Sequence, residues 1–166
     1  MERFLEARAW EVVPGGIMVI ICLGVSDGVS ASQLPFGILY DNLASSLMDM
    51  ATEGLLNEAQ VDSFNLPIYI TCPAEMTRLI EKNGHFSIER IELAEPATWL
   101  KGSIDTREWI NHVRAAMEGT FLEHFKKDLI DEMFERTIRR LSQYSKEINE
   151  KLHEKVQLFA VLKRKE

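Results

Sequence analysis

The segment Asp62–Asn65 is the sharpest local motif that could bind a cation. It reads Asp-Ser-Phe-Asn and is followed by Leu66 and Pro67. In a tight turn, the Asp62 carboxylate, the Phe64 main-chain carbonyl and the Asn65 side-chain oxygen would converge. Hard oxygen donors of this kind suit Mg²⁺, which usually keeps several of its waters. Asp and Asn also bond turn amides without any ion, and the residues alone favour that simpler role.

No other group of residues has the spacing of a catalytic or metal site. The histidines stand apart from Cys and from carboxylates at any ligand spacing, so surface or packing roles are expected. They are His85, His112, His124 and His153. No Ser/His/Asp set with a recognisable spacing is visible. Chemistry that depends on an acid–base triad is therefore not indicated.

Composition and charge exclude several classes of partner. The chain has 166 residues and a net charge of -7, which argues against a phosphate-binding surface for nucleic acid. The longest apolar run, residues 17–23, is too short to cross a bilayer. The first residues resemble neither a signal nor a transit peptide, and Cys22 and Cys72 are far apart. The sequence predicts reduced thiols in a cytoplasmic protein with no membrane partner.

Three apolar segments predict strands that would form the frame for any site. Residues 17–23 and 155–163 are almost wholly apolar, as in strands buried on both faces, whereas residues 86–93 alternate apolar and polar side chains. Helical spacing of apolar residues predicts helices over 2–13, 36–53, 73–83, 105–125 and 128–151. Residues 25–35, 62–67 and 96–103 are expected to be loops.

The count of strands indicates an incomplete sheet. Strands that are apolar on both faces usually lie in the middle of a larger sheet. Two of the three predicted strands have this character. The pattern therefore predicts an α/β fold in which part of the sheet is supplied from outside this sequence.

Several motifs, in order, resemble one plant enzyme family. Residues 4–19, FLEARAWEVVPGGIMV, are similar to the family segment FLxARAxELVPGGxMV. Residues 47–56, LMDMATEGLL, resemble LNDMVAEGLI, and residues 61–69, VDSFNLPIY, resemble LDSFNxPxY. Residues 81–92, EKNGHFSIERIE, resemble EKxGSFxIxRLE. The family is the salicylate–benzoate–theobromine (SABATH) methyltransferases, and the resemblance covers the second half of its pattern.

This resemblance implies an incomplete Rossmann-like methyltransferase sheet, of about three strands, with an α-helical cap. Residues 1–24, 71–95 and 153–166 would form the C-terminal part of the core, and residues 25–70 and 96–152 the cap. The final strand would be the antiparallel strand that inserts between its neighbours. The elements that hold S-adenosylmethionine in the family have no counterpart here. Gly15 and Gly16 precede a strand rather than follow one, so they are expected to form a turn and not a cofactor loop.

The resemblance also implies a set of substrate-binding residues. Tyr40 replaces a cap Trp that stacks on aromatic substrates, and Leu39 adjoins it. Tyr69 matches a pocket Tyr that can offer its hydroxyl to a polar substrate atom. Val113 stands where salicylate-type members carry a Met, and Ala116 lies one turn further on. Plain helix packing remains the alternative for Tyr40 and Val113, whose departures from the family leave the acceptor open.

The expected function is S-adenosylmethionine-dependent methylation of the carboxylate of a small plant metabolite. The resemblance makes Asp62, Phe64 and Asn65 a candidate magnesium site that lacks an upstream Asn. The chain alone is expected to be an inactive, truncated form that dimerises with itself or with a full-length paralogue. One alternative is a non-catalytic interaction protein that pairs with such a paralogue, and another is a self-contained α+β binding domain.

Overall fold

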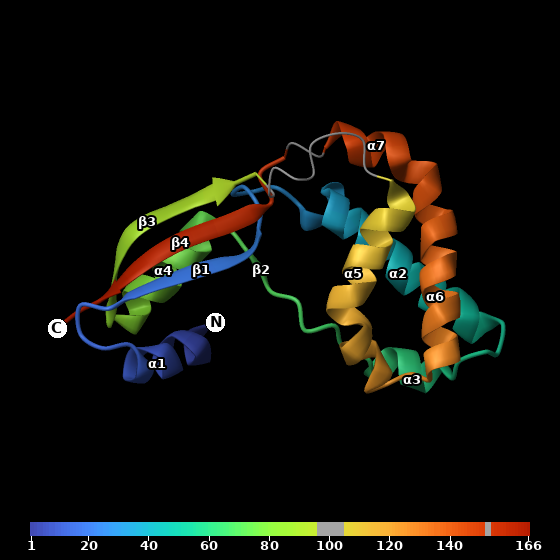
Figure 1. Ribbon diagram of the computed structural model, residues 1–166, viewed down its shortest axis with the longest axis horizontal. Coiled ribbons are helices and arrows are strands. Elements are labelled where there is room, and N and C mark those ends of the chain that lie inside the picture. Colours follow the sequence, from blue (N-terminus) through green and yellow to red (C-terminus); the bar gives the residue numbers. More distant parts are fainter. Residues whose placement is uncertain (96–104, 152–153) are drawn as a thin grey trace. The chain divides into compact units, whose positions relative to one another are not determined.

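The computed structural model describes residues 1–95, 105–151 and 154–166 and divides them into two compact units. The first, here called the sheet unit, contains residues 1–31, 69–95 and 154–166. The second, the helical unit, contains residues 32–68 and 105–151. Figure 1 shows strands in the first unit and only helices in the second. The predicted roles of core and cap for these parts remain predictions.

The sheet unit contains a four-stranded sheet of order β2-β1-β4-β3. The strands are β1 (Ile17–Gly24), β2 (Ile70–Thr71), β3 (Phe86–Ala94) and β4 (Gln157–Arg164). Strand β4 lies between β1 and β3 and runs antiparallel to both, as the resemblance implied. Strand β2 pairs in parallel with the end of β1 and was not predicted. It adds a short fourth strand to the sheet of about three strands that was expected.

Two helices cover one face of this sheet. They are α1 (Glu2–Glu11) and α4 (Pro73–Asn83). Pro73 at the first helical position and Gly84 at the C-cap, with φ of 76°, give α4 the predicted limits. Their buried side chains form a core with alternate residues of the strands. That core contains Leu5, Ala9, Ile20, Met76, Ile80, Phe86, Leu158, Ala160 and Leu162.

The helical unit packs its helices around a separate apolar core. Its elements are η1 (Ala31–Gln33), α2 (Pro35–Thr52), α3 (Glu58–Ser63), α5 (Thr106–Leu122), α6 (Lys127–Leu141), η3 (Ser142–Tyr144) and α7 (Ser145–Glu150). The helix predicted over 128–151 is therefore interrupted after Leu141. The core is formed by apolar residues of α2, α5 and α6, including Leu43, Met50, Phe121, Met133 and Phe134. No described helix combines the length and apolar character that a membrane span requires.

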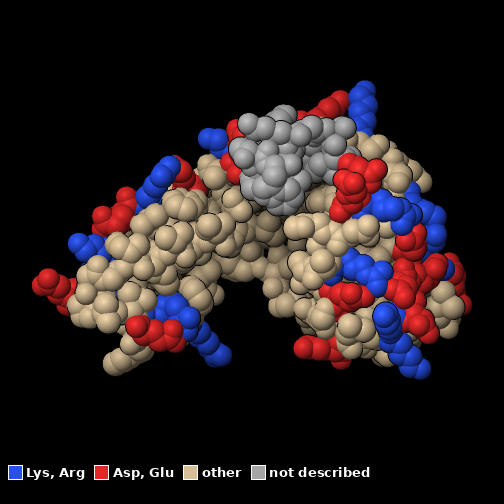
Figure 2. Space-filling view, in the orientation of Figure 1, with Lys and Arg blue, Asp and Glu red and all other residues tan. Residues whose placement is uncertain are grey.

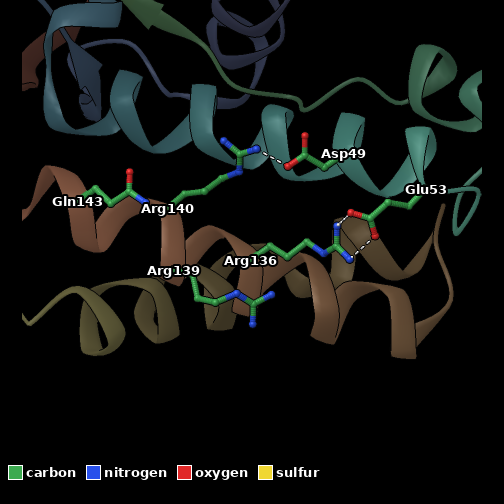
Figure 3. Close-up of a pocket in the computed structure, with 6 residues that line it drawn as sticks. All are labelled: Asp49, Glu53, Arg136, Arg139, Arg140 and Gln143. Carbon is green, nitrogen blue, oxygen red and sulfur yellow. Dashed lines mark hydrogen bonds and ion pairs between the residues drawn. The ribbon is translucent and has the colours of Figure 1, made fainter.

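Charged pairs join α6 to its neighbours across this core. Arg136 donates two hydrogen bonds of 2.7 Å to the carboxylate of Glu53, the C-cap residue of α2, and Arg140 pairs with Asp49 (Figure 3). On the other side, Arg107 of α5 makes a two-pronged contact of 2.8 and 3.1 Å with Glu135. Paired bonds of this geometry fix the relative orientation of two helices.

Candidate substrate-binding site

Tyr40 is the best placed of the predicted acceptor-binding residues. It lies on α2, half-buried against the helical core, and its ring centroid is 6.4 Å from that of Phe36 one turn earlier. Burial raises the pKa of its hydroxyl above the ordinary 10.0, so the group stays protonated at neutral pH. Its hydroxyl makes no hydrogen bond with another described residue, so it is available as a donor to a bound carboxylate.

The other predicted helical residues have different degrees of burial. Leu39 is 2% exposed and belongs to the core of the helical unit. Val113 on α5 is half-buried and packs against the same core. Ala116 is exposed on α5. The structure thus brings Leu39, Tyr40 and Val113 to one apolar cluster and leaves Ala116 outside it.

Two neighbours of Val113 were missed by the sequence analysis. Trp109 and Met117 lie four residues before and after Val113 on α5, and all three are half-buried against the core. Residues four apart share a helix face, so these side chains form one apolar stripe. This spacing is visible in the sequence, as is the spacing of Phe36 and Tyr40. A stripe that is only partly covered could contact an apolar acceptor.

Tyr69 lies in the sheet unit, whereas the other predicted substrate residues lie in the helical unit. Its hydroxyl donates to the Glu75 carboxylate over 3.3 Å, and the Thr71 hydroxyl donates to the same carboxylate over 3.0 Å. Burial raises the pKa of Tyr69, and the negative charge of Glu75 adds to the rise. Glu75, which no motif singled out, therefore fixes the position of this hydroxyl at the start of α4.

The segment Asp62–Asn65 differs from the expected tight turn. Asp62 and Ser63 form the last turn of α3, and Phe64 is its C-cap with an extended backbone. The Phe64 ring packs into an aromatic group, 5.1 Å from the Phe121 ring and 5.0 Å from the Phe125 ring. These ring contacts stabilise the extended backbone at the end of α3 in place of a tight turn.

A histidine stabilises the end of the same helix. His124 Nε2 lies 2.7 Å from the Gln60 carbonyl and 3.2 Å from Ser63 Oγ, and Ser63 donates to the same carbonyl. The short contact to a carbonyl requires a proton on Nε2, so this nitrogen cannot accept the Ser63 proton. The pair caps α3 and is not a nucleophile with its base. Across the described residues, three or more His, Cys, Asp or Glu side chains do not gather as a metal site.

The fold and these residues define the class of protein. A mixed sheet with its last strand inserted antiparallel, joined to a unit of helices, is the arrangement of Rossmann-like methyltransferases. The apolar stripe and the free Tyr40 hydroxyl suit an acceptor that is held and desolvated rather than activated by an acid–base group.

Comparison with known proteins gives the family directly. The profile described as "SAM dependent carboxyl methyltransferase" matches residues 1–165, and this chain belongs to that family. A probable S-adenosylmethionine-dependent methyltransferase of Arabidopsis thaliana is 39% identical over 99% of this chain and 45% of its own length. Loganic acid O-methyltransferase of Catharanthus roseus is 38% identical over 99% of this chain and 44% of its own length.

A solved structure of a methyltransferase is similar to this chain in fold as well as in sequence. A loganic acid methyltransferase with SAH matches at a TM-score of 0.90 and 37% identity, over 99% of this chain and 47% of that chain. The chain therefore spans about half the length of the relatives that it matches. Within the described residues, no strand is followed by a Gly-x-Gly turn that opens a helix, which is the usual cradle of an adenosyl cofactor in this class of fold.

Proposed function

We propose that this chain supplies the acceptor-binding side of an S-adenosylmethionine-dependent carboxyl methyltransferase whose substrate is a small carboxylic acid. The observation that carries the proposal is the match, at a TM-score of 0.90, to a loganic acid methyltransferase with SAH. The family description names the carboxyl group as the methylated group. A relative that is 38% identical acts, by its name, on loganic acid.

In this proposal the helical unit binds and desolvates the acceptor. Trp109, Val113 and Met117 provide the apolar wall, and Tyr40 provides a neutral hydroxyl that donates to the acid. A carboxylate is already a nucleophile at neutral pH, so the protein does not have to remove a proton from it. The protein still has to exclude water and to hold one carboxylate oxygen in line with the methyl group that is transferred.

Tyr69 has a positional role in the same proposal. Its hydroxyl is directed by Glu75, which also holds Thr71 beside the parallel end of β1 and β2. Ligands of α/β sheets bind at the carboxyl ends of parallel strands. Leu39 supports the wall from the core, and Ala116, exposed on α5, would contact the acceptor only at the margin of the wall.

A chimera tests the function. The part of the Catharanthus roseus relative that lies outside its match would be joined to this chain, and transfer of labelled methyl from S-adenosylmethionine measured on a panel of carboxylic acids. We expect transfer to at least one acid by the chimera and none by the 166-residue chain alone. A chimera that binds the donor in a calorimeter but methylates no acid would overturn the proposal.

The chain alone is expected to bind no donor. Titration calorimetry with S-adenosylmethionine checks this expectation, and tight binding by the 166-residue chain would contradict it.

Three further features remain predictions. A magnesium ion at Asp62, Phe64 and Asn65 would raise the melting temperature of the chimera in Mg²⁺, and Asp62→Asn would abolish the rise.

Dimerisation, with a second copy or a full-length paralogue, is checked by light scattering. Cytoplasmic location is checked by imaging a fluorescent fusion in plant cells.

A further inference from the structure

A serine follows a group of arginines at the end of α6. The segment reads Arg139-Arg140-Leu141-Ser142, and Arg136 lies one turn earlier. Ser142 is the only serine or threonine of the chain that has an arginine three residues before it. Figure 2 shows acidic and basic side chains mixed over the helical unit, so three arginines within five positions make this segment locally basic. A protein with an acidic binding site can recognise such a segment by its charge.

Arg139 is the arginine of this group that is available to a partner. Its side chain is 63% exposed, and within the described residues its guanidinium contacts only the Glu132 carboxylate, at 3.4 Å. Figure 3 shows this guanidinium apart from the ion pairs that Arg136 and Arg140 make. A long contact between exposed groups adds little to stability, so Arg139 can leave it at little cost.

The Ser142 hydroxyl lies at the surface, at the end of a helix. Ser142 is exposed, and it is both the C-cap of α6 and the first residue of η3. Its hydroxyl donates a hydrogen bond of 2.8 Å to the Ile138 carbonyl. A phosphate on this oxygen carries nearly two negative charges at neutral pH and has no proton to donate. Phosphorylation would therefore replace the hydrogen bond by repulsion from the carbonyls at the negative end of α6.

The elements after Ser142 depend on few buried contacts. Of the residues in η3 and α7, Ile148 alone is buried. Ser145, at the start of α7, donates a hydrogen bond of 3.1 Å to the Ser142 carbonyl. Short segments with few buried side chains open easily, so this part of the chain can unwind to enter the site of another protein.

Helix α7 also holds the start of α2, the helix that carries Tyr40. Lys151, directly after α7, donates a hydrogen bond of 2.7 Å to the Gln33 carbonyl, just before α2 begins. Ile148 packs into the core of the helical unit, against which Tyr40 is half-buried. A change at Ser142 can therefore reach the acceptor-binding residues through α7.

We propose that Ser142 is a phosphorylation site for an arginine-directed serine/threonine kinase, and that its phosphate loosens α7 from the start of α2. The kinase transfers the terminal phosphoryl group of ATP to Ser142 Oγ. The new P–O bond forms, the bond to ADP breaks, and the hydroxyl proton passes to the kinase. Arg139 and Arg140 supply the charges that the acidic peptide site of such a kinase binds. The modification does not depend on the proposed function, whereas its effect on the acceptor rests on it.

Phosphorylation of the 166-residue chain in vitro tests the site, with labelled ATP and the catalytic subunit of cyclic-AMP-dependent protein kinase as the probe. We expect about one phosphate per chain, located at Ser142 by fragment mass spectrometry, and none in Ser142→Ala. Arg139→Gln should lower the initial rate at least about tenfold, because a recognised charge is lost. Arg78→Gln, at an exposed arginine of α4, is the matched control and should leave the rate unchanged. No incorporation at Ser142, or equal rates in the two arginine variants, would overturn the proposal.

Hydrogen exchange tests the effect of the phosphate on α7. We expect the amides of residues 145–151 to exchange at least about fivefold faster in the phosphorylated chain than in the unmodified chain. Ser142→Ala should have a smaller effect, because it loses the bond to Ile138 without adding charge at the end of α6. Equal exchange in the phosphorylated and unmodified chains would overturn the loosening of α7.

The chimera described above separates this inference from the proposed function. In an active chimera, phosphorylation of Ser142 should raise the KM for the acid at least about threefold, because α2 is held less firmly. A KM that phosphorylation leaves unchanged would overturn the link between α7 and the acceptor. A chimera that methylates no acid would refute the proposed function, while phosphate at Ser142 with faster exchange in α7 would still support the modification and its effect on the fold.

Discussion

At the scale of single residues, the two tyrosines predicted to bind the substrate have different environments. The Tyr69 hydroxyl is bonded to Glu75, whereas the Tyr40 hydroxyl has no partner within the described part of the chain. Both have a pKa raised mainly by burial. The difference matters because a hydroxyl that already has a partner gains less by bonding to a substrate. Tyr40 is therefore the stronger candidate for contact with an acceptor carboxylate.

Replacing Tyr40 by Phe removes this donor and leaves the ring. We expect Tyr40→Phe to raise the KM of the chimera for its acid about tenfold or more, because a hydrogen bond to a charged group is lost. Steady-state kinetics with varied acid measure it. Tyr144→Phe, at an exposed tyrosine of η3, is the matched control. An unchanged KM in Tyr40→Phe would exclude the hydroxyl from acceptor binding.

Tyr40 also makes stability depend on pH in the alkaline range. Its folded-state pKa lies above the ordinary 10.0, so the fold favours the protonated phenol. The resulting stabilisation is complete below the ordinary pKa and is lost as pH rises through the folded pKa. The chain should lose stability above about pH 10, and Tyr40→Phe should lose less of it. Urea unfolding at a series of alkaline pH values measures this, with Tyr144→Phe as control. If the free energy of unfolding falls with pH as steeply in Tyr40→Phe as in the unmodified chain, the prediction is contradicted.

At the scale of elements, strong apolar patterns were predictable and weak ones were not. The runs that became β1 and β4, and the Pro73 and Gly84 limits of α4, have local causes that sequence shows. Helix α3 was missed because none of its residues is buried, so it has no apolar stripe. Strand β2 has two residues and exists only through its pairing with β1. The insertion of β4 between β1 and β3 came from the resemblance, because contacts between distant segments leave no local pattern.

The site was predictable to a similar degree. Tyr40 and Val113 came from the resemblance, and their helical neighbours Phe36, Trp109 and Met117 could have been added from spacing alone. Glu75 could not have been predicted from spacing, because its bonds to Tyr69 and Thr71 depend on how α4 follows β2. The helical conformation of Asp62 was not predicted because α3, to which it belongs, has no buried residue and so no apolar stripe.

The contact between α2 and α6 gives a prediction about elements. Arg136 is largely buried and bonds Glu53 (Figure 3). It also bonds Glu132, whereas Arg139 is exposed and contacts Glu132 at 3.4 Å. Arg136→Met should lower the free energy of unfolding by about 1–2 kcal/mol, because a two-pronged bond between helices is lost. Arg139→Met should change it by less than about 0.5 kcal/mol. Urea denaturation measures both, and equal losses would show that the two-pronged bond adds nothing.

At the scale of the whole molecule, the two units have separate apolar cores. The core of the sheet unit and that of the helical unit have no residue in common. Two units unfold together when the loss of one core destabilises the other. Units with separate cores can unfold one at a time. The chain crosses between the units several times, so its connectivity alone does not make them independent.

Two methionine substitutions test whether the units unfold independently. Met76 in the sheet unit and Met133 in the helical unit are both fully buried. Each Met→Ala change should cost about 2–5 kcal/mol through the lost apolar contact and the cavity left behind. We expect Met133→Ala to speed hydrogen exchange in α2 and α6 and to leave β1 and β4 unchanged, and Met76→Ala to do the reverse. If either variant speeds hydrogen exchange equally in both units, the two units unfold as one cooperative body, and the separation of their cores does not make them independent.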